Sequence, residues 1–195
     1  MSSLVVPFLT YALLMTFTPG PNNVSSSALG LRLGYRGTLP YLLGICTGFV
    51  VIMLCGGLLT EFLTRNYAVI SPYLKWVGAL YMAWLAVSLF LPSHKGKAVA
   101  RDGFAGGLLL QFVNPKGILY GITIYASFSA LLTGSFFKTV GSALFLTAIA
   151  FAAISTWALV GSILSRYFEN RFFRLGFNIV MALLLAYSAV SILLH

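Results

Sequence analysis

Thr18-Pro19-Gly20-Pro21-Asn22-Asn23 stands in the middle of an apolar run that extends from about residue 4 to residue 33. A helix over the whole run would be about 45 Å long at 1.5 Å per residue, whereas the hydrocarbon core of a bilayer is roughly 30 Å thick. Proline lacks a backbone donor and its ring clashes with the preceding turn. The stretch therefore predicts that a membrane helix breaks here, near the middle of the membrane.

A second stretch of the same kind, Gln111-Phe112-Val113-Asn114-Pro115-Lys116-Gly117, interrupts the overlong run 104–132. Pro19 and Pro115 are 96 positions apart, close to half of the chain. Each stretch combines proline with asparagine inside an apolar segment. We therefore expect two broken helices at corresponding places in two halves of the chain, which in transporters mark a binding site near the midplane.

Composition places these breaks in a membrane protein. Of 195 residues, 59% are apolar and 8% are charged, with a net charge of +9. Soluble domains are about 25% charged, and a soluble fold of this size has too few polar side chains here to cover its apolar surface. The cations lie between long apolar runs, which is typical of topogenic charge and argues against a nucleic-acid partner.

The hydropathy pattern predicts an all-α polytopic membrane protein with six transmembrane helices, as two inverted three-helix repeats in which helices 1 and 4 are broken near mid-membrane. Residues 1–195 form a single membrane domain in this interpretation, with repeat one at about 1–92 and repeat two at about 104–195. The six spans expected are roughly 4–33, 41–60, 73–91, 104–132, 139–164 and 174–194.

The distribution of lysine and arginine predicts the orientation. Loops one, three and five hold eight cations, whereas loops two and four hold three. The positive-inside rule therefore places the odd loops in the cytoplasm and both termini outside. The cations of the odd loops are Arg32, Arg36, Lys95, Lys97, Arg101, Arg166, Arg171 and Arg174, and those of the even loops are Arg65, Lys75 and Lys138.

The helix breaks supply the candidate binding residues. We expect Asn22 or Asn23 to cap the half-helix after the first break, and Asn114 to cap the second half-helix with Pro115 at its first position. The N-terminus of each half-helix attracts a carboxylate. Lys116 lies 12 positions into its span, where a cation costs about 2.5–3.5 kcal/mol. We expect Lys116 to bind substrate. Alternatively, it is a structural group that caps backbone carbonyls or extends to the membrane–water interface.

Other features leave alternatives open. Gly44 and Gly48 fit a small-xxx-small contact between helices, and Trp157, deep in span five, is the best aromatic candidate for the site. One of Ser25–Ser27 with Lys116 as base would suit a membrane-embedded hydrolase, although no third orienting group is evident. A passive channel or a packing subunit is a further alternative to a carrier.

The three acidic residues, Glu61, Asp102 and Glu169, all fall at span ends or in loops. Proton-driven carriers usually relay protons through ionisable groups at mid-depth. Coupling of proton movement to export must therefore use Lys116, a carboxylate at a span end or the charge of the substrate. The sequence is compatible with each of these three. A basic substrate is disfavoured, because the predicted pocket holds a lysine and no acid.

The two motifs resemble the signature segments of the lysine exporter/homoserine–threonine exporter family of bacterial amino-acid efflux proteins. The resemblance covers essentially the whole chain in length, span count and motif position. Pro19, Gly20, Pro21 and Asn22 match the first motif, and Asn114, Pro115 and Lys116 match the second. The segment from Gln111 to Gly121, with the doubled Asn22-Asn23, is most similar to the cysteine/O-acetylserine exporter branch.

The resemblance implies a multi-pass exporter of small amino acids in the bacterial inner membrane, driven by the proton motive force as an antiporter, and not an enzyme. The partners expected are a small amino acid and the bilayer, with a homodimer left open; no cofactor or metal is expected. The predicted substrate site consists of Pro19, Gly20, Pro21, Asn22, Asn23, Gln111, Asn114, Pro115, Lys116 and Trp157.

Overall fold

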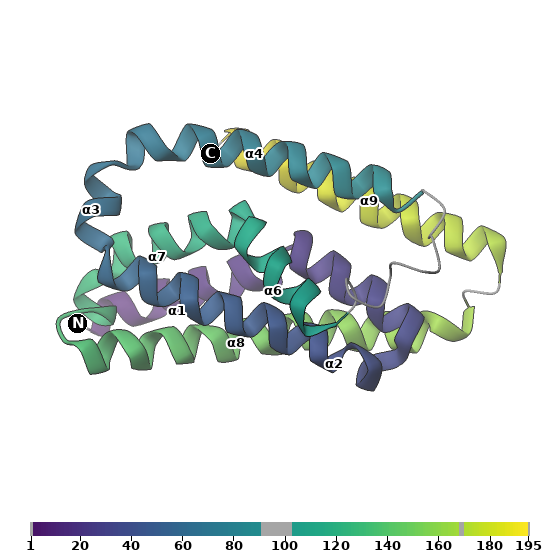
Figure 1. The fold of residues 1–195 in the computed structure, drawn as a ribbon, viewed down its shortest axis with the longest axis horizontal. Helices are drawn as coiled ribbons and strands as arrows, with labels where there is room; N and C mark the ends of the chain where they lie inside the picture. Colours follow the sequence, from purple (N-terminus) through teal and green to yellow (C-terminus); the bar gives the residue numbers. More distant parts are fainter. Residues whose placement is uncertain (1, 91–102, 168–169, 195) are drawn as a thin grey trace.

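A computed structural model describes residues 2–90, 103–167 and 170–194 of the chain. Its regular elements in these ranges are all helices, which confirms the all-α prediction for the described part of the chain (Figure 1). The elements are α1 (Ser2–Phe17), α2 (Pro21–Leu58), α3 (Thr60–Arg65), α4 (Tyr67–Ser88), α6 (Phe104–Val113), α7 (Pro115–Leu132), α8 (Phe136–Leu164), the 3₁₀ turn η1 (Ser165–Tyr167) and α9 (Arg171–Leu194).

Both predicted helix breaks are present. α1 ends at Phe17 and α2 begins at Pro21, so the first interruption covers the predicted motif. α6 ends at Val113 and α7 begins at Pro115, with Asn114 in extended conformation between them. In each case the new helix begins at a proline, whose fixed φ suits a first helical turn and whose missing N–H is not needed there.

The first predicted loop, between residues 33 and 41, contains fewer non-helical residues than the sequence suggested. α2 continues through residues 34–40 and departs from helical geometry at Gly34, where φ is +68° and ψ is 170°. Residues with a side chain rarely adopt this left-handed φ, which glycine reaches without strain. The chain turns back on itself near this point, so α2 contributes two antiparallel arms (Figure 1).

Glycines let the two arms of α2 approach α8 and α6 closely. A Cβ at Gly30 would lie 2.1 Å from the carbonyl oxygen of Ala158 on α8, and one at Gly44 would lie 2.0 Å from that of Phe104 on α6. The contact is reciprocal, because a Cβ at Gly107 on α6 would lie 2.0 Å from Tyr41 O. The predicted close helix contact at Gly44 and Gly48 is therefore confirmed.

Three segments are long and apolar enough to cross a bilayer, which makes the chain a multi-pass membrane protein: Pro21–Leu58, Phe136–Tyr167 and Arg171–Leu194. The count of six spans and their arrangement as inverted repeats stay predictions. The loop-three cations Lys95, Lys97 and Arg101 lie outside the described residues, as do Asp102 and Glu169.

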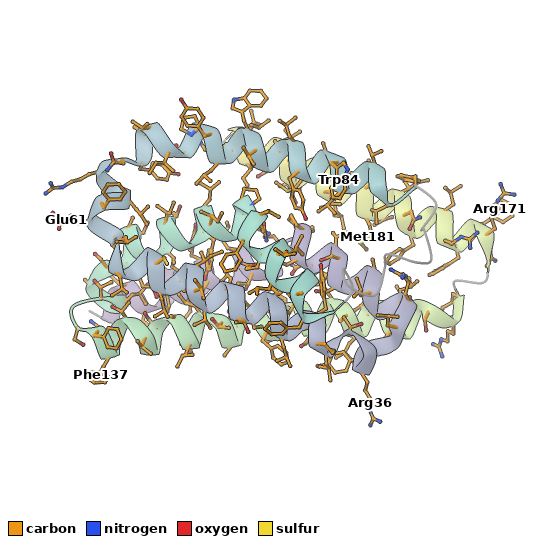
Figure 2. The ribbon with its side chains drawn as sticks, viewed as in Figure 1. Arg36, Glu61, Trp84, Phe137, Arg171 and Met181 are labelled. Carbon is orange, nitrogen blue, oxygen red and sulfur yellow. The ribbon has the colours of Figure 1, made fainter. Side chains whose placement is uncertain are left out.

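Three labelled charged residues of the predicted loops and span ends lie toward the ends of the molecule (Figure 2). Arg36 and Arg171, from predicted loops one and five, lie at one end, whereas Glu61 lies at the other with Phe137 (Figure 2). α4 and α9 pack against each other along one side, where Asn178 Nδ2 donates to Leu89 O at 2.9 Å (Figure 1). This pair also contacts both breaks, because Ser188 Oγ of α9 donates to Pro19 O at 2.7 Å and Gly78 of α4 lies against Pro115.

Candidate substrate site at two helix breaks

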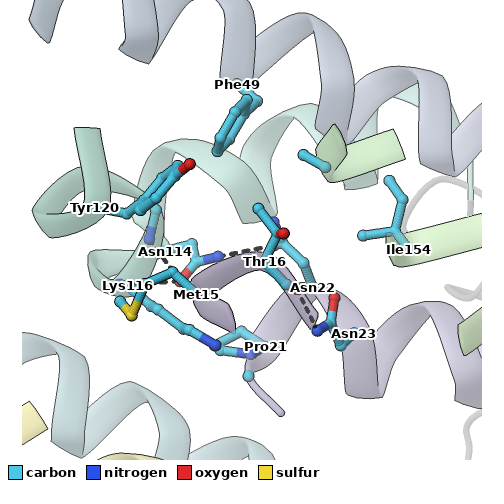
Figure 3. Close-up of a pocket in the computed structure, with 13 residues that line it drawn as sticks. Met15, Thr16, Pro21, Asn22, Asn23, Phe49, Asn114, Lys116, Tyr120 and Ile154 are labelled. Atoms are coloured by element: carbon cyan, nitrogen blue, oxygen red, sulfur yellow. Dashed lines mark hydrogen bonds between the residues drawn. The ribbon is translucent and has the colours of Figure 1, made fainter. Parts of the chain in front are cut away.

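The two helix breaks meet in space although they lie far apart in the sequence. Asn114 Nδ2, in the second break, donates to Asn22 Oδ1, just after the first break, over 2.8 Å (Figure 3). Asn114 is 2% exposed, so this contact lies inside the protein. The fold therefore brings both predicted motifs to one place.

Asn114 caps α7 as predicted. Its Oδ1 accepts from the backbone N–H groups of Lys116 at 3.1 Å and Gly117 at 3.4 Å, and Pro115 occupies the first helical position. Since Oδ1 is held by two N–H groups, the amide NH₂ must be the end that faces Asn22. The start of α7 thus fixes the direction in which Asn114 donates.

Asn114, Asn22 and Gln111 form a chain of side-chain hydrogen bonds in which each amide donates to the next. Asn22 receives at Oδ1 and donates from Nδ2 to Gln111 Oε1 at 2.6 Å. Gln111 is fully buried, and its Nε2 has no hydrogen-bond partner among the described residues. Glycines make room for this amide, because a Cβ at Gly117 would lie 2.6 Å from Nε2 and one at Gly48 would lie 2.9 Å from Gln111 Cβ.

The prediction that Asn22 or Asn23 caps α2 is wrong. The N-cap residue is Gly20, in extended conformation, and no described side chain makes a capping hydrogen bond there. Asn23 Nδ2 donates instead to the carbonyl oxygens of Thr16 and Thr18, both at 2.8 Å. The physical reason is that Pro21 starts α2 two residues earlier than a cap at Asn22 requires. The Asn23 amide therefore faces the end of α1, whose last carbonyls lack helical partners.

Lys116 binds the same end of α1. Its Nζ donates to Thr18 O at 2.8 Å, Thr18 Oγ1 at 2.8 Å and Pro19 O at 3.1 Å. An ammonium group has three N–H donors, so all of them are used. The cation also lies at the negative end of the α1 dipole. In this conformation Lys116 caps carbonyls, as the structural alternative predicted, and its contact with substrate stays a prediction.

A pocket opens between the breaks (Figure 3). Six of the ten predicted site residues line it: Gly20, Pro21, Asn22, Asn23, Asn114 and Lys116. The pocket lies between the ends of α1 and α6, the starts of α2 and α7, the second arm of α2, and α8. Residues from both halves of the chain therefore share one cavity.

The other four predicted site residues lie around the pocket without lining it. Pro19 presents its carbonyl to Lys116, and Pro115 packs near Gly78 of α4, where a Cβ would come within 2.3 Å of its ring. Gln111 acts through Asn22. Trp157 donates from Nε1 to Phe17 O at 3.3 Å, at the end of α1. All four hold the breaks in place.

Sequence reasoning missed the apolar part of the lining. Tyr120 carried a signal that could have found it, because it lies one helical turn after Lys116 and on the same face of α7. Met15 and Thr16 directly precede the first break. The α2 and α8 residues lie in uniform apolar runs that carry no such signal. The missed lining residues are Met15, Thr16, Phe49, Gly117, Tyr120, Ala150 and Ile154.

Comparison with known proteins identifies the family. The LysE type translocator family matches residues 13–195. The chain belongs to this family. The translocator is 37% identical over 192 residues to the cysteine/O-acetylserine efflux protein of Salmonella typhi, with 97% of each chain covered. It is 36% identical over 197 residues to the protein of the same name from Escherichia coli (strain K12), with 97% of each chain covered. No solved structure matches the chain.

The family makes this protein a transporter rather than an enzyme. In the structure, Lys116 Nζ donates to Thr18 and Pro19, and Ser25 Oγ donates to Asn22 O at 3.0 Å.

Proposed function

We propose that this translocator is a secondary transporter that exports small neutral amino acids, of the cysteine/O-acetylserine or homoserine/threonine type, from the bacterial cytoplasm. The observation that carries the proposal is the meeting of the two helix breaks at one pocket, through the bond between Asn114 and Asn22. The printed names of the relatives support the direction and the substrate class.

The substrate carboxylate binds at the start of α2 in this proposal. The first backbone N–H groups of a helix need partners, and α2 has no capping side chain in the described structure. Asn22 and Asn23, which carry the first of these donors at the positive end of the α2 dipole, line the pocket. The start of α7 is a poorer site, because Asn114 already accepts from its N–H groups.

Lys116 links carboxylate binding to a change of conformation. Its side chain crosses Gly20, where a Cβ would lie 3.2 Å from Nζ, so the ammonium stands beside the start of α2. A carboxylate is a stronger acceptor for an ammonium than a neutral carbonyl is. A bound carboxylate therefore draws Lys116 away from Thr18 and Pro19, and the end of α1 is released from α7.

The proposed topology has six spans in two inverted three-helix repeats, with both termini outside the bacterial inner membrane. The position of Arg36 and Arg171 at one end of the molecule supports a common cytoplasmic side for loops one and five (Figure 2). Alternating access then opens the pocket to each side in turn. The proton motive force drives export, by exchange of protons for substrate.

Purified protein in proteoliposomes tests the proposal. Vesicles are loaded with a labelled mixture of amino acids, and release of each is followed with and without an imposed pH gradient, beside protein-free vesicles. Saturable release of a few neutral amino acids that accelerates with the gradient is expected. Unselective, unsaturable release would indicate a channel, and no release by folded protein would contradict the proposal.

A further inference from the structure

The hydroxyl of Tyr120 is a buried polar group without a partner. Tyr120 lies on α7 and is 3% exposed. Its Oη makes no hydrogen bond within the described parts of the chain. Leaving a buried hydroxyl unpaired is costly, and native proteins pair almost all such groups. An exception of this kind needs an explanation.

Two aromatic rings stack with the ring of Tyr120. Tyr11 of α1 stacks on it with centroids 5.9 Å apart and planes at 22°, and Phe49 of α2 stacks with centroids 5.9 Å apart and planes at 21°. These two contacts oppose rotation of the Tyr120 side chain about χ1, which is the rotation that would move its hydroxyl oxygen toward a distant partner. The hydroxyl is therefore fixed in place before any ligand arrives.

Tyr120 belongs to the wall of the pocket. Figure 3 shows Tyr120 reaching from α7 toward the space between Phe49 and Thr16. The lining combines the apolar side chains of Met15, Phe49, Ala150 and Ile154 with the polar side chains of Thr16, the three asparagines and Lys116. Four buried side-chain atoms in the described residues lack partners, at Ser26, Ser27, Gln111 and Tyr120. Of these four residues, Tyr120 is the one that lines the pocket.

We infer that the Tyr120 hydroxyl binds the polar side-chain atom of the substrate and thereby determines specificity. This inference rests on the proposed function, in which the substrate's carboxylate binds beside Lys116. Lys116 and Tyr120 are one helical turn apart, about 6 Å along the axis, a span that an amino-acid head group and a short side chain fill. The ligand class is a neutral α-amino acid whose short side chain ends in a hydroxyl, thiol or ester group.

Selection against alkyl isosteres follows from this arrangement. A substrate with a polar side-chain atom satisfies the hydroxyl, whereas an alkyl side chain of the same shape leaves it unpaired. The difference is the value of one hydrogen bond in a buried site, which corresponds to roughly tenfold in rate at equal concentration. Tyr120→Phe keeps the stacked ring and removes the hydroxyl, so it isolates this effect.

Internal competition in proteoliposomes measures the selectivity. Vesicles are loaded with equal concentrations of L-threonine and L-valine, or of L-serine and L-2-aminobutyrate, and the ratio of initial release rates is recorded. These pairs differ by one hydroxyl in place of one methyl. The wild type is expected to favour the hydroxyl member about tenfold, and Tyr120→Phe to bring the ratio within about twofold of one.

Tyr125→Phe is the matched control. Tyr125 is also a buried tyrosine of α7, but its hydroxyl is paired with Ser142 Oγ at 2.9 Å and it does not line the pocket. This variant is expected to keep the wild-type ratio. An unchanged ratio in Tyr120→Phe, or an equal loss in both variants, would overturn the inference.

Two further outcomes separate the inference from the proposed function. If the wild type releases amino acids but does not favour the hydroxyl members, the inference fails and the exporter proposal stands. If it releases none, the exporter proposal fails first. Should Tyr120→Phe not fold, Phe49→Leu frees one face of the ring and is expected to lower the ratio several-fold; an unchanged ratio there also overturns the inference.

Discussion

Asn114 Nδ2 donates to Asn22 Oδ1 over 2.8 Å and so joins two helix breaks that are 92 residues apart in the chain. Each asparagine also makes a second hydrogen bond. Asn114 caps α7, and Asn22 donates to Gln111 near the end of α6. One bond therefore links the starts of two helices that come from different halves of the translocator. The first prediction tests this link.

Asn114→Ala should destabilise the protein by more than the loss of a cap alone. Removal of an N-cap asparagine costs about 1 kcal/mol, and here Asn22 also loses its donor inside the protein. Asn170→Ala is the matched control, because Asn170 accepts from Phe172 N and Phe173 N at the exposed start of α9. Thermal unfolding in detergent should show the larger drop in melting temperature for Asn114→Ala. Equal drops would mean that the bond to Asn22 contributes nothing.

Lys116→Ala should reduce export at least tenfold while the amount of folded protein in the membrane stays near that of the wild type. The proposed mechanism needs the ammonium to exchange between the end of α1 and the substrate carboxylate. Lys138→Ala is the control, since Lys138 Nζ also caps a helix carbonyl, that of Ala130 at 2.9 Å, but on the exposed surface. Undiminished export in Lys116→Ala would show that this lysine is purely structural.

Tyr125→Phe should lower the thermal stability of the protein without substrate, whereas Tyr120→Phe should not. Removing an unpaired buried hydroxyl relieves a desolvation penalty, so Tyr120→Phe should unfold at the same temperature as the wild type or a higher one. Tyr125→Phe removes a hydrogen bond to Ser142 and should cost about 1 kcal/mol. A clear loss of stability in Tyr120→Phe would reveal a partner for its hydroxyl in the empty protein.

Gly44→Ala should be poorly tolerated, whereas Gly141→Ala should be neutral or stabilising. The added methyl at Gly44 would lie 2.0 Å from a backbone oxygen of α6, which no side-chain movement can relieve. Gly141, in α8, has nothing within 4 Å of the same position, and alanine favours a helix over glycine by about 1 kcal/mol. Yield and thermal unfolding of the purified variants measure the difference. Equal behaviour would contradict the close contact between α2 and α6.

Phe137→Cys and Phe172→Cys test the orientation. Both phenylalanines are highly exposed, at 85% and 84%, and they lie in predicted even and odd loops respectively. In a background without Cys46 and Cys55, a membrane-impermeant thiol reagent on intact cells should label Phe137→Cys and not Phe172→Cys. The reverse pattern would place both termini inside.

The local features of the site could be predicted from sequence. Proline dictates where a helix can begin, so both breaks were predictable, and the Asn114 cap depends on residues within three positions of it. The partners of Lys116 were not predictable, because Thr18 lies 98 residues away and the contact depends on how α1 packs against α7. Asn23 was assigned the wrong role for a related reason: the motif does not tell which of two adjacent helix ends an amide faces.

In the fold and the pocket, too, local features could be predicted from sequence, whereas those that depend on tertiary packing could not. Gly34 narrows a predicted loop to one residue, since glycine's left-handed φ turns the chain without any further loop residues. Tyr120 was not included in the predicted site, because an aromatic residue in an apolar helix more often serves in packing or at the interface than in substrate contact. Its role in the pocket emerges from two stacking partners on α1 and α2, which sequence spacing does not place.

The glycine contacts join three helices into one unit. Backbones approach each other directly at Gly30, Gly44 and Gly107, so α2 is held against both α6 and α8. These helices come from both halves of the chain. The unit that they form therefore crosses the boundary between the two predicted repeats.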